Sequence, residues 1–413
     1  TSAYEYLEKR FNKATRLLGS AAFVLLQLGR MGVVLFLPAL ALSTVTGVNV
    51  YACIVVMGVL ATVYTVLGGI EAVVWTDVLQ VFVLLGGAVL SLVIIALKLA
   101  AAEGGLAAAF TMIGDADKLR LADFDWTATQ AVLWVVIVGS AAQNLVSYTS
   151  DQTVVQRYLT TKDEKAAARG IWTNALLCIP ASVIFFGVGT ALWAFYKTHP
   201  ELLNPVGKSD DVFPWFIAQQ LPVGVAGLVI AGLFAAAMSS LDSSMNSMAT
   251  AITTDFYCWF HPAASDRHLL LVARYLTLLL GILGTGSAVV IAMLNSPSMW
   301  NQYLKVIGLF GGGLAGLFAL GIFTRRTNAQ GAIVGLVASA AVLYRVATAT
   351  AVHFVLYAAV GMGSCFAIGY AVSLLIPGEP GELENLTIFT LSGDGLPSRR
   401  GNGDQAGEQE SVQ

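Results

Sequence analysis

The sequence PVGVAGLVIAGLFAAAMSSLDSSMNSMATAITTDFY, residues 222–257, decides the fold of this chain. A helix that crosses a bilayer needs about 20 consecutive apolar residues, and this run contains no charged residue before Asp242. The run is too long for one upright crossing, so we expect the helix to tilt or to end in water. The stretch therefore predicts a membrane-spanning helix that carries an unusual polar segment.

Further apolar runs of similar length lie on both sides of this stretch. They are residues 17–43, 48–68, 75–101, 128–149, 171–196, 269–294, 302–323, 329–348 and 351–376. Hydrophobic residues make up 57% of the chain and charged residues only 11%, whereas a soluble domain has roughly 25% charged residues. We therefore predict an all-α polytopic membrane protein in a lipid bilayer, with a transmembrane domain over 1–376 and a polar cytoplasmic tail over 377–413.

Several classes of protein are disfavoured by the composition. The formal net charge is −3, which does not favour a nucleic-acid partner. The four cysteines form no CxxC pair, and the four histidines show no metal-ligand spacing. The sequence therefore predicts neither a disulfide framework nor a zinc site, and it does not set the oligomeric state.

Basic residues predict the orientation in the membrane. Lys and Arg gather in the N-terminal segment, in the links after the fourth, sixth and eighth runs, and in the tail. These segments share one side if ten spans alternate, and Lys and Arg favour the cytoplasmic side. We therefore expect both termini of this chain to be cytoplasmic, in the cell inner (plasma) membrane.

Small and polar residues form one stripe on the predicted helix 222–257. Offsets of 0, 3, 4, 7 and 11 put the following residues on one helical face: Ala236, Ser239, Ser240, Ser243 and Ser247. Small residues at this spacing commonly allow close helix packing, and that interpretation stays open for alanine and serine alone. Packing does not explain Asp242, which borders the stripe. A carboxylate beside hydroxyl oxygens suits a hard monovalent cation such as sodium.

Two charged residues in other apolar runs also need a reason, because a charge at mid-membrane costs roughly 2.5–3.5 kcal/mol. Arg30 lies near the middle of the run 17–43. It is either a structural partner for a buried carboxylate or for carbonyl groups, or a clamp for the carboxylate of an anionic solute. Asp77, near the start of the run 75–101, is either interfacial or functional.

Four separated motifs resemble the sodium:solute symporter family, and most of all its bacterial sodium–sialic acid symporter branch. They are TSAYEYLEKRF (1–11), GGIEAVVWTDVLQ (68–80), SDQTVVQRYL (150–159), and AAAMSSLDSSMNS (235–247) followed by TTDFY (253–257). The resemblance extends to about residue 376 and implies the leucine-transporter-type fold, with two inverted repeats of five helices. Members of the branch have three helices before the first motif. We therefore expect this sequence to be a fragment that lacks the first helices of the fold.

The resemblance also implies which residues bind sodium. A shared sodium site maps to the carbonyl of Ala236 and the hydroxyls of Ser239 and Ser240, with its remaining ligands in the helix expected before this sequence. A second sodium site maps to Asp77, Ser239, Asp242 and Ser243. At one of these positions, Asp242, the branch has a serine, so two carboxylates would lie near one site. They would bind sodium more strongly or share a proton.

The resemblance implies a substrate pocket as well. Arg30 matches the arginine that grips the carboxylate of sialic acid, and Ser140 stands where the branch has an aromatic pocket residue. We therefore expect a sodium-coupled secondary active symporter that imports a small anionic solute, such as sialic acid. The alternative is a neutral solute, a sugar or proline, with Arg30 in a structural role.

Other functional classes fit the sequence less well. Asp77 and Asp242 could mimic the dyad of an intramembrane protease, but the GxGD motif of such enzymes is missing. A channel would not need coupled sites, and a sensor would need an output domain that the tail does not provide. We therefore predict a transporter and not an enzyme.

Overall fold

The structure is a computed structural model of the 413-residue chain. It describes residues 2–390 except 121, 160, 204–208, 295–297, 377, 379–380 and 382. The side chains of 68–77, 79 and 159 are also outside the described part, although the backbone there is helical.

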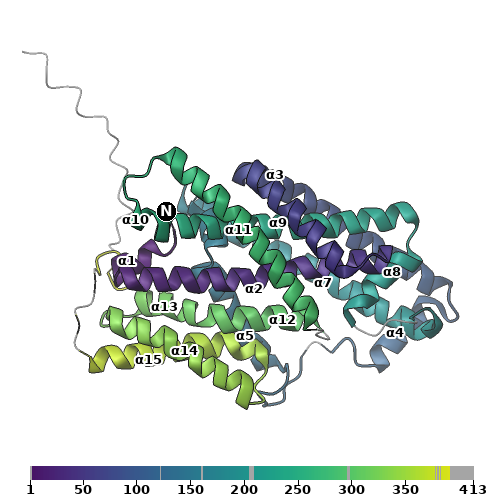
Figure 1. The fold of residues 1–413 in the computed structure, drawn as a ribbon. Helices are drawn as coiled ribbons and strands as arrows, with labels where there is room; N and C mark the ends of the chain where they lie inside the picture. The colour runs from purple at the N-terminus through teal and green to yellow at the C-terminus, as the bar shows by residue number, and fades with distance from the viewer. Residues whose placement is uncertain are drawn as a thin grey trace, which may run out of the picture.

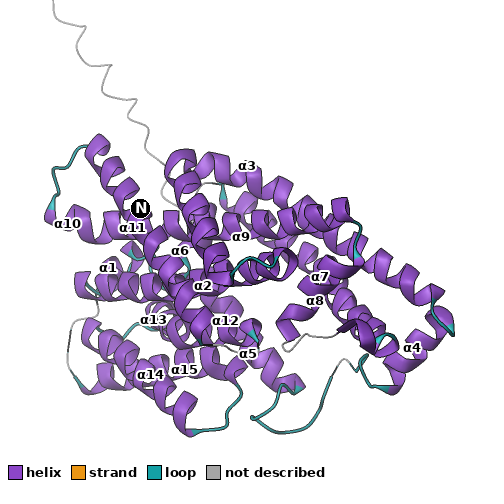
Figure 2. Ribbon diagram, turned by 45° about the vertical axis from the view of Figure 1, so that its right-hand side comes forward, coloured by secondary structure: helices purple, strands orange, loops and turns teal. Residues whose placement is uncertain are grey.

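The described residues form helices and connecting loops, without strands (Figure 1, Figure 2). The longer helices are α2 (Lys13–Thr46), α3 (Val50–Ala101), α7 (Glu164–Thr198), α9 (Val223–Ala251), α11 (Asp266–Met293), α14 (Ala329–Ala349) and α15 (Tyr357–Leu375). The shorter ones are α1 (Glu5–Arg10), α4 (Gly105–Asp115), α5 (Leu133–Leu145), α6 (Gln152–Leu159), α8 (Val212–Gln220), α10 (Cys258–Phe260), α12 (Met299–Val306) and α13 (Gly312–Phe323). Three π-helical turns, Val146–Ser150, Ile252–Tyr257 and Ile307–Gly311, follow α5, α9 and α12.

Nine helical segments in the described part of the chain are long and apolar enough to cross a membrane. Large apolar side chains such as Leu67, Phe82, Phe186 and Leu375 are largely exposed on the outside of the bundle. Soluble proteins rarely expose so many, whereas lipid is a favourable environment for them. The chain is therefore a multi-pass membrane protein, as predicted.

The predicted link at 69–74 is not a loop, because α3 is helical from Val50 to Ala101. The link contains glycine but no proline, and glycine weakens a helix by only about 1 kcal/mol. At about 1.5 Å per residue, the 52 residues of α3 would be ~78 Å long, more than twice the roughly 30 Å of a bilayer core. Its apolar stretches Val50–Leu67 and Gln80–Ala101 are each long and apolar enough to cross a membrane.

The predicted span 128–149 is shorter in the structure. Helix α5 covers Leu133–Leu145, and the π-helical turn Val146–Ser150 ends at Asp151, which has an extended backbone. Residues 128–132, with the sequence ATQAV, lie in a loop before the helix. An apolar run alone therefore overestimates the helix, and this segment is not among the nine candidate spans.

Helix α2 lies at the centre of the bundle. Its Phe23 and Met31 belong to one buried cluster with Met245 of α9, Leu280 of α11 and Leu317 of α13. Lipid is as apolar as these side chains, so close packing and hydrogen bonds, more than the hydrophobic effect, hold such helices together. The buried cluster fixes α9 against α2 and thereby positions the polar face of α9.

The segment before α2 is also buried. The side chain of Arg10 is 0% exposed, and its guanidinium donates hydrogen bonds to the carbonyls of Gly321 (3.1 Å), Thr324 (2.9 Å) and Thr327 (3.3 Å). The last carbonyls of a helix have no partner within it, so Arg10 caps the end of α13. Burial lowers the pKa of Arg10 below its ordinary value.

Candidate functional site

A cavity of about 360 Å³ lies where four helices meet. Its wall is formed by Arg30 of α2; Gln80, Val81 and Leu84 of α3; Thr153, Val154 and Arg157 of α6; and Ala236, Ser239, Ser240 and Ser243 of α9. Small-molecule sites typically have volumes of roughly 300–1,000 Å³. The cavity is therefore large enough to hold part of a small solute.

The structure brings four residues of the predicted stripe to this one wall: Ala236, Ser239, Ser240 and Ser243. Offsets of 3, 4 and 7 place side chains on the same face of a helix. The fifth stripe residue, Ser247, lies one turn further along and donates its hydroxyl to the carbonyl of Ser243 (2.7 Å). Three serine hydroxyls within about one turn offer the hard oxygen ligands that suit sodium.

Asp242 lies on a different side of α9 and is not part of this wall. It is 1% exposed, and its carboxylate accepts a short hydrogen bond from the hydroxyl of Thr65 in α3. One step along a helix rotates the side chain by about 100°, which turns Asp242 away from the cavity that Ser243 faces. The residues mapped to the second sodium site therefore do not all share one surface. Asp77 lies in the part of α3 whose side chains are outside the described residues.

Arg30 fits both roles that its sequence position left open. Its Nη1 lies 3.1 Å from Oδ2 of Asp151, so it pairs with a buried carboxylate. The same side chain is 25% exposed and lines the cavity. Within the described part of the chain, its buried Nε has no hydrogen-bond partner. A guanidinium that lines a cavity can bind the carboxylate of a solute.

A second guanidinium reaches the cavity from α6. Arg157 donates a hydrogen bond from Nη2 to Oγ of Ser243 at 3.0 Å. Arg30 and Arg157 are the two charged residues of the described wall, and both are cationic. Positive charge in a concave, partly desolvated site favours an anionic ligand.

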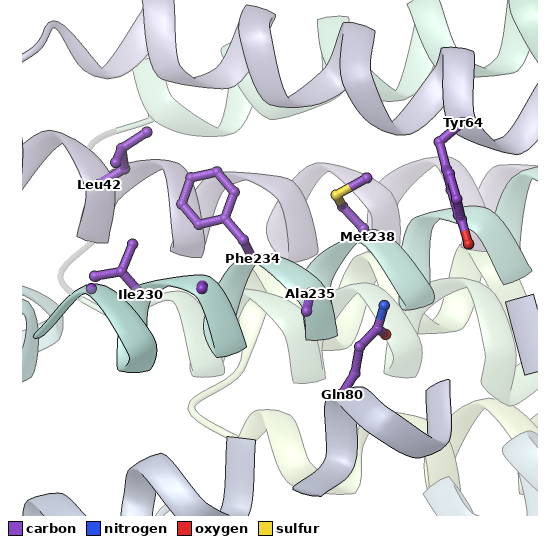
Figure 3. A pocket seen from close by; sticks show the side chains of 9 residues that line it. Leu42, Tyr64, Gln80, Ile230, Phe234, Ala235 and Met238 are labelled. Atoms are coloured by element: carbon purple, nitrogen blue, oxygen red, sulfur yellow. The ribbon is translucent and has the colours of Figure 1, made fainter. Parts of the chain in front are cut away.

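A larger cavity of about 630 Å³ shares Gln80 with the first. Its wall is mostly apolar and includes Leu42, Tyr64, Ile230, Phe234 and Met238. Figure 3 shows Phe234, Met238 and Tyr64 along one side of this pocket, with the amide of Gln80 opposite. The Oε1 atom of Gln80 is buried and has no hydrogen-bond partner among the described residues. The smaller cavity therefore contains the charged groups, and the larger cavity beside it has few polar groups.

Ser140 is not brought to either cavity. It is half-buried on α5, and its carbonyl accepts a hydrogen bond from Nδ2 of Asn144 (2.9 Å). Helix α5 packs against α15 and the turn Phe354–Leu356, away from the polar face of α9. A role for Ser140 in substrate binding therefore stays a prediction.

Several polar residues at or behind the cavity were not predicted from the sequence, among them Gln27, Gln80, Asp151 and Arg157. A signal existed for two of them, because Asp151 and Arg157 belong to the motif SDQTVVQRYL, which directly follows an apolar run. A charge at that position carries an energetic cost and needs a partner. The two glutamines are uncharged and interrupt no pattern, so the sequence gives no comparable signal for them.

Comparison with known proteins places the chain in a family. The family model described as the sodium:solute symporter family matches residues 2–339. The sodium/sialic acid symporter NanT of Aliivibrio fischeri is 39% identical over 371 residues, which cover 90% of this chain and 73% of that protein. The sodium/sialic acid symporter SiaT of Proteus mirabilis is 36% identical over 371 residues, which cover 89% of this chain and 74% of that protein.

A solved structure gives the same result for the fold. A Na⁺-coupled sialic acid symporter in a substrate-bound outward-open state superimposes with a TM-score of 0.82 and 34% identity, covering 92% of this chain and 78% of that chain. The predicted fold class, an all-α membrane protein of the leucine-transporter type, is confirmed by this overlap. The resemblance first seen in four sequence motifs is confirmed by the match over most of the chain, and the chain belongs to the sodium:solute symporter family.

Proposed function

We propose that this sodium:solute symporter imports a small carboxylated solute, with sialic acid as the leading candidate. The observation that carries the proposal is one cavity whose wall combines Arg30 of α2 with the hydroxyl face of α9. Symport requires that solute and cation occupy neighbouring sites whose occupancies affect each other. The arrangement provides an anion-binding group and a set of hard oxygen ligands in the same place.

The charge of the wall supports an anionic solute over a neutral one. Two guanidinium groups face the cavity. A neutral sugar has no carboxylate to offer them, and the carboxylate of proline is accompanied by a positive charge of its own. The two relatives named above, from Aliivibrio fischeri and Proteus mirabilis, are described as sodium/sialic acid symporters. The adjoining 630 Å³ cavity leaves space for a solute larger than a simple monocarboxylate.

The proposed sodium ligands are the carbonyl of Ala236 and the hydroxyls of Ser239 and Ser240. Their side chains line the cavity from one face of α9. A cation bound there would fix α9 against α3 and α6 and so favour the arrangement that binds the solute. The membrane potential adds about 2.3 kcal/mol for each charge that crosses 100 mV.

A second sodium, held by Asp77, Ser239, Asp242 and Ser243, is a separate proposal. It requires Asp242 to exchange its hydrogen bond with Thr65 for the cation. It also requires Ser243 to release Arg157. Sodium uptake counted per solute molecule would test it, since a ratio of one would contradict a second coupled ion.

We propose that the protein lies in the plasma membrane with both ends of this chain in the cytoplasm. The clusters of Lys and Arg near the N-terminus and in the tail support this orientation. A tag placed after residue 413 that is digested by protease in intact spheroplasts would contradict it.

The function is tested by uptake of labelled sialic acid into proteoliposomes under an inward sodium gradient. Ser240→Ala removes one proposed ligand, so sodium-dependent uptake should be abolished. Ser91→Ala is the control, because Ser91 is buried and its hydroxyl donates to the carbonyl of Gly87 in its own helix, away from the cavity. Unchanged sodium dependence in Ser240→Ala would refute the site, and equal uptake with a potassium gradient would refute the function.

A further inference from the structure

Asp151 lies at a break between two helical segments. The π-helical turn Val146–Ser150 ends there, the backbone of Asp151 is extended (φ −83°, ψ 107°), and α6 begins at Gln152. A helix break in a membrane protein exposes polar groups and is tolerated where protein or a cavity surrounds it. At this break α6 can move relative to α5 without disrupting a continuous helix.

The carboxylate of Asp151 is buried and fully engaged. Its side chain is 5% exposed, and its Oδ2 lies 3.1 Å from Nη1 of Arg30. Its Oδ1 accepts hydrogen bonds from Nε2 of Gln27 and from the backbone N–H of Thr153, both at 2.9 Å. Arg30 and Gln27 belong to α2, so the carboxylate ties the break to the central helix.

The two neighbours of Asp151 hold the break from another direction. The carbonyl of Ser150 accepts a hydrogen bond from the hydroxyl of Tyr4 (2.9 Å), and Oε1 of Gln152 accepts one from the backbone N–H of Ala3 (2.7 Å). These donors lie in the segment that leads into α1. Three consecutive residues thus connect the break to two other parts of the chain.

Arg30 faces two carboxylate positions. The carboxylate of Asp151 occupies one position. The other position is in the cavity, where the carboxylate of the proposed solute would bind. The guanidinium presents one charge, so it cannot compensate both carboxylates equally. When a solute carboxylate takes Arg30, the ion pair with Asp151 weakens.

We propose that Asp151 is an internal competitor for Arg30, a positioning residue that holds the guanidinium in the solute-free protein and releases it when the solute binds. The inference rests on the proposed function, since it needs Arg30 to bind the solute. Release of Asp151 loosens the tie between α2 and the break before α6, and α6 carries Thr153, Val154 and Arg157 of the cavity wall. Solute binding thereby allows α6, which forms part of the cavity wall, to move.

Asp151→Asn tests the inference, because the amide oxygen still accepts the hydrogen bonds from Gln27 and Thr153 while the charge is lost. The KM for sialic acid should fall by about tenfold, the factor expected if Asp151 holds Arg30 in roughly nine molecules of ten. The maximal uptake rate should fall as well, because binding no longer releases a restraint. Asp151→Glu, which keeps the charge, should restore KM toward the original value.

Two controls separate competition from a general loss of structure. Asp255→Asn breaks another buried ion pair, with Arg16 at 2.6 Å, and should not lower KM. The methyl ester of sialic acid has no carboxylate, so its inhibition constant should be the same for Asp151→Asn and the unmodified protein. An unchanged or higher KM in Asp151→Asn, or an equal gain for the ester, would overturn the inference.

A measurement on the unmodified protein covers the case in which Asp151→Asn fails to fold. Hydrogen exchange of the amides in 146–153 should become faster when sialic acid and sodium are added, and slower or unchanged exchange would overturn the inference. Arg30→Gln distinguishes the two proposals. Failure of the unmodified protein to bind sialic acid would refute the proposed function. Undiminished binding by Arg30→Gln would refute Arg30 as the group that binds the solute carboxylate, and lost binding by Arg30→Gln without the effect of Asp151→Asn would refute only the competition.

Discussion

At the scale of single residues, Asp242 connects the polar helix to its neighbour. It is 1% exposed within a helix that is long and apolar enough to cross the membrane. A buried carboxylate needs hydrogen-bond donors to compensate for lost water, and Thr65 of α3 provides one. Helices α3 and α9 pack against each other, so this bond lies between the helix with the proposed sodium face and the helix beside it.

Thr65→Val keeps the shape of the side chain and removes the donor. We expect the protein to lose about 1–3 kcal/mol of stability, the usual range when a buried acceptor loses its partner. Thermal unfolding in detergent measures the loss. Thr62→Val is the matched control, because the hydroxyl of Thr62 donates to the carbonyl of Gly58 in its own helix (2.6 Å). Equal destabilisation by the two substitutions would contradict the importance of the Asp242 contact.

The residues of the site differ in how far the sequence could predict them. Ser239, Ser240 and Ser243 were predictable as one face, because the period of a helix fixes their relative directions. The ion pair of Arg30 with Asp151 was not, because 121 positions separate the two residues and only packing brings them together. For the same reason the sequence identified Asp242 as unusual but could not say that it faces Thr65.

At the scale of helices, the close contact between α13 and α15 depends on glycine. A Cβ atom added to Gly312 would lie 2.8 Å from the carbonyl oxygen of Ala358 and 3.1 Å from its Cα. These are backbone atoms, which cannot rotate away as a side chain can. The two helices can therefore approach this closely only without a side chain at position 312.

Gly312→Ala should destabilise the protein by about 1–3 kcal/mol, the usual cost of overpacking. Gly363→Ala in α15 is the control, because nothing lies within 4 Å of its added Cβ. Alanine favours a helix over glycine by about 1 kcal/mol, so this control should be neutral or slightly stabilising. Thermal unfolding midpoints of both variants provide the comparison, and a loss confined to Gly363→Ala would contradict the contact.

The sequence predicted most helices but not their interruptions. Long apolar runs correspond to α2, α7, α9, α11, α14 and α15, because a membrane helix needs length and hydrophobicity that composition reveals. The π-helical turns after α5, α9 and α12 were not predicted. They depend on local packing, which the length and hydrophobicity of a run do not reveal. The break at Asp151, which shapes the cavity wall, is one of these interruptions.

At the scale of the whole molecule, the described bundle has a polar cavity inside and an apolar outer surface. The cavity lies between α2, α3, α6 and α9, and it joins groups suited to an anion with groups suited to a sodium ion. Coupling between two ligands is reciprocal, so sodium must raise the affinity for the solute by the same factor as the solute raises that for sodium. This linkage is the central claim for the molecule.

Calorimetric titration of the detergent-solubilised transporter with sialic acid, in sodium buffer and in matched potassium buffer, tests this claim most directly. The account predicts tighter binding in sodium, by the 5–150-fold range typical of coupled sites, with the gain lost in Ser240→Ala and kept in Ser91→Ala. Equal affinity for sialic acid in sodium and in potassium would contradict it.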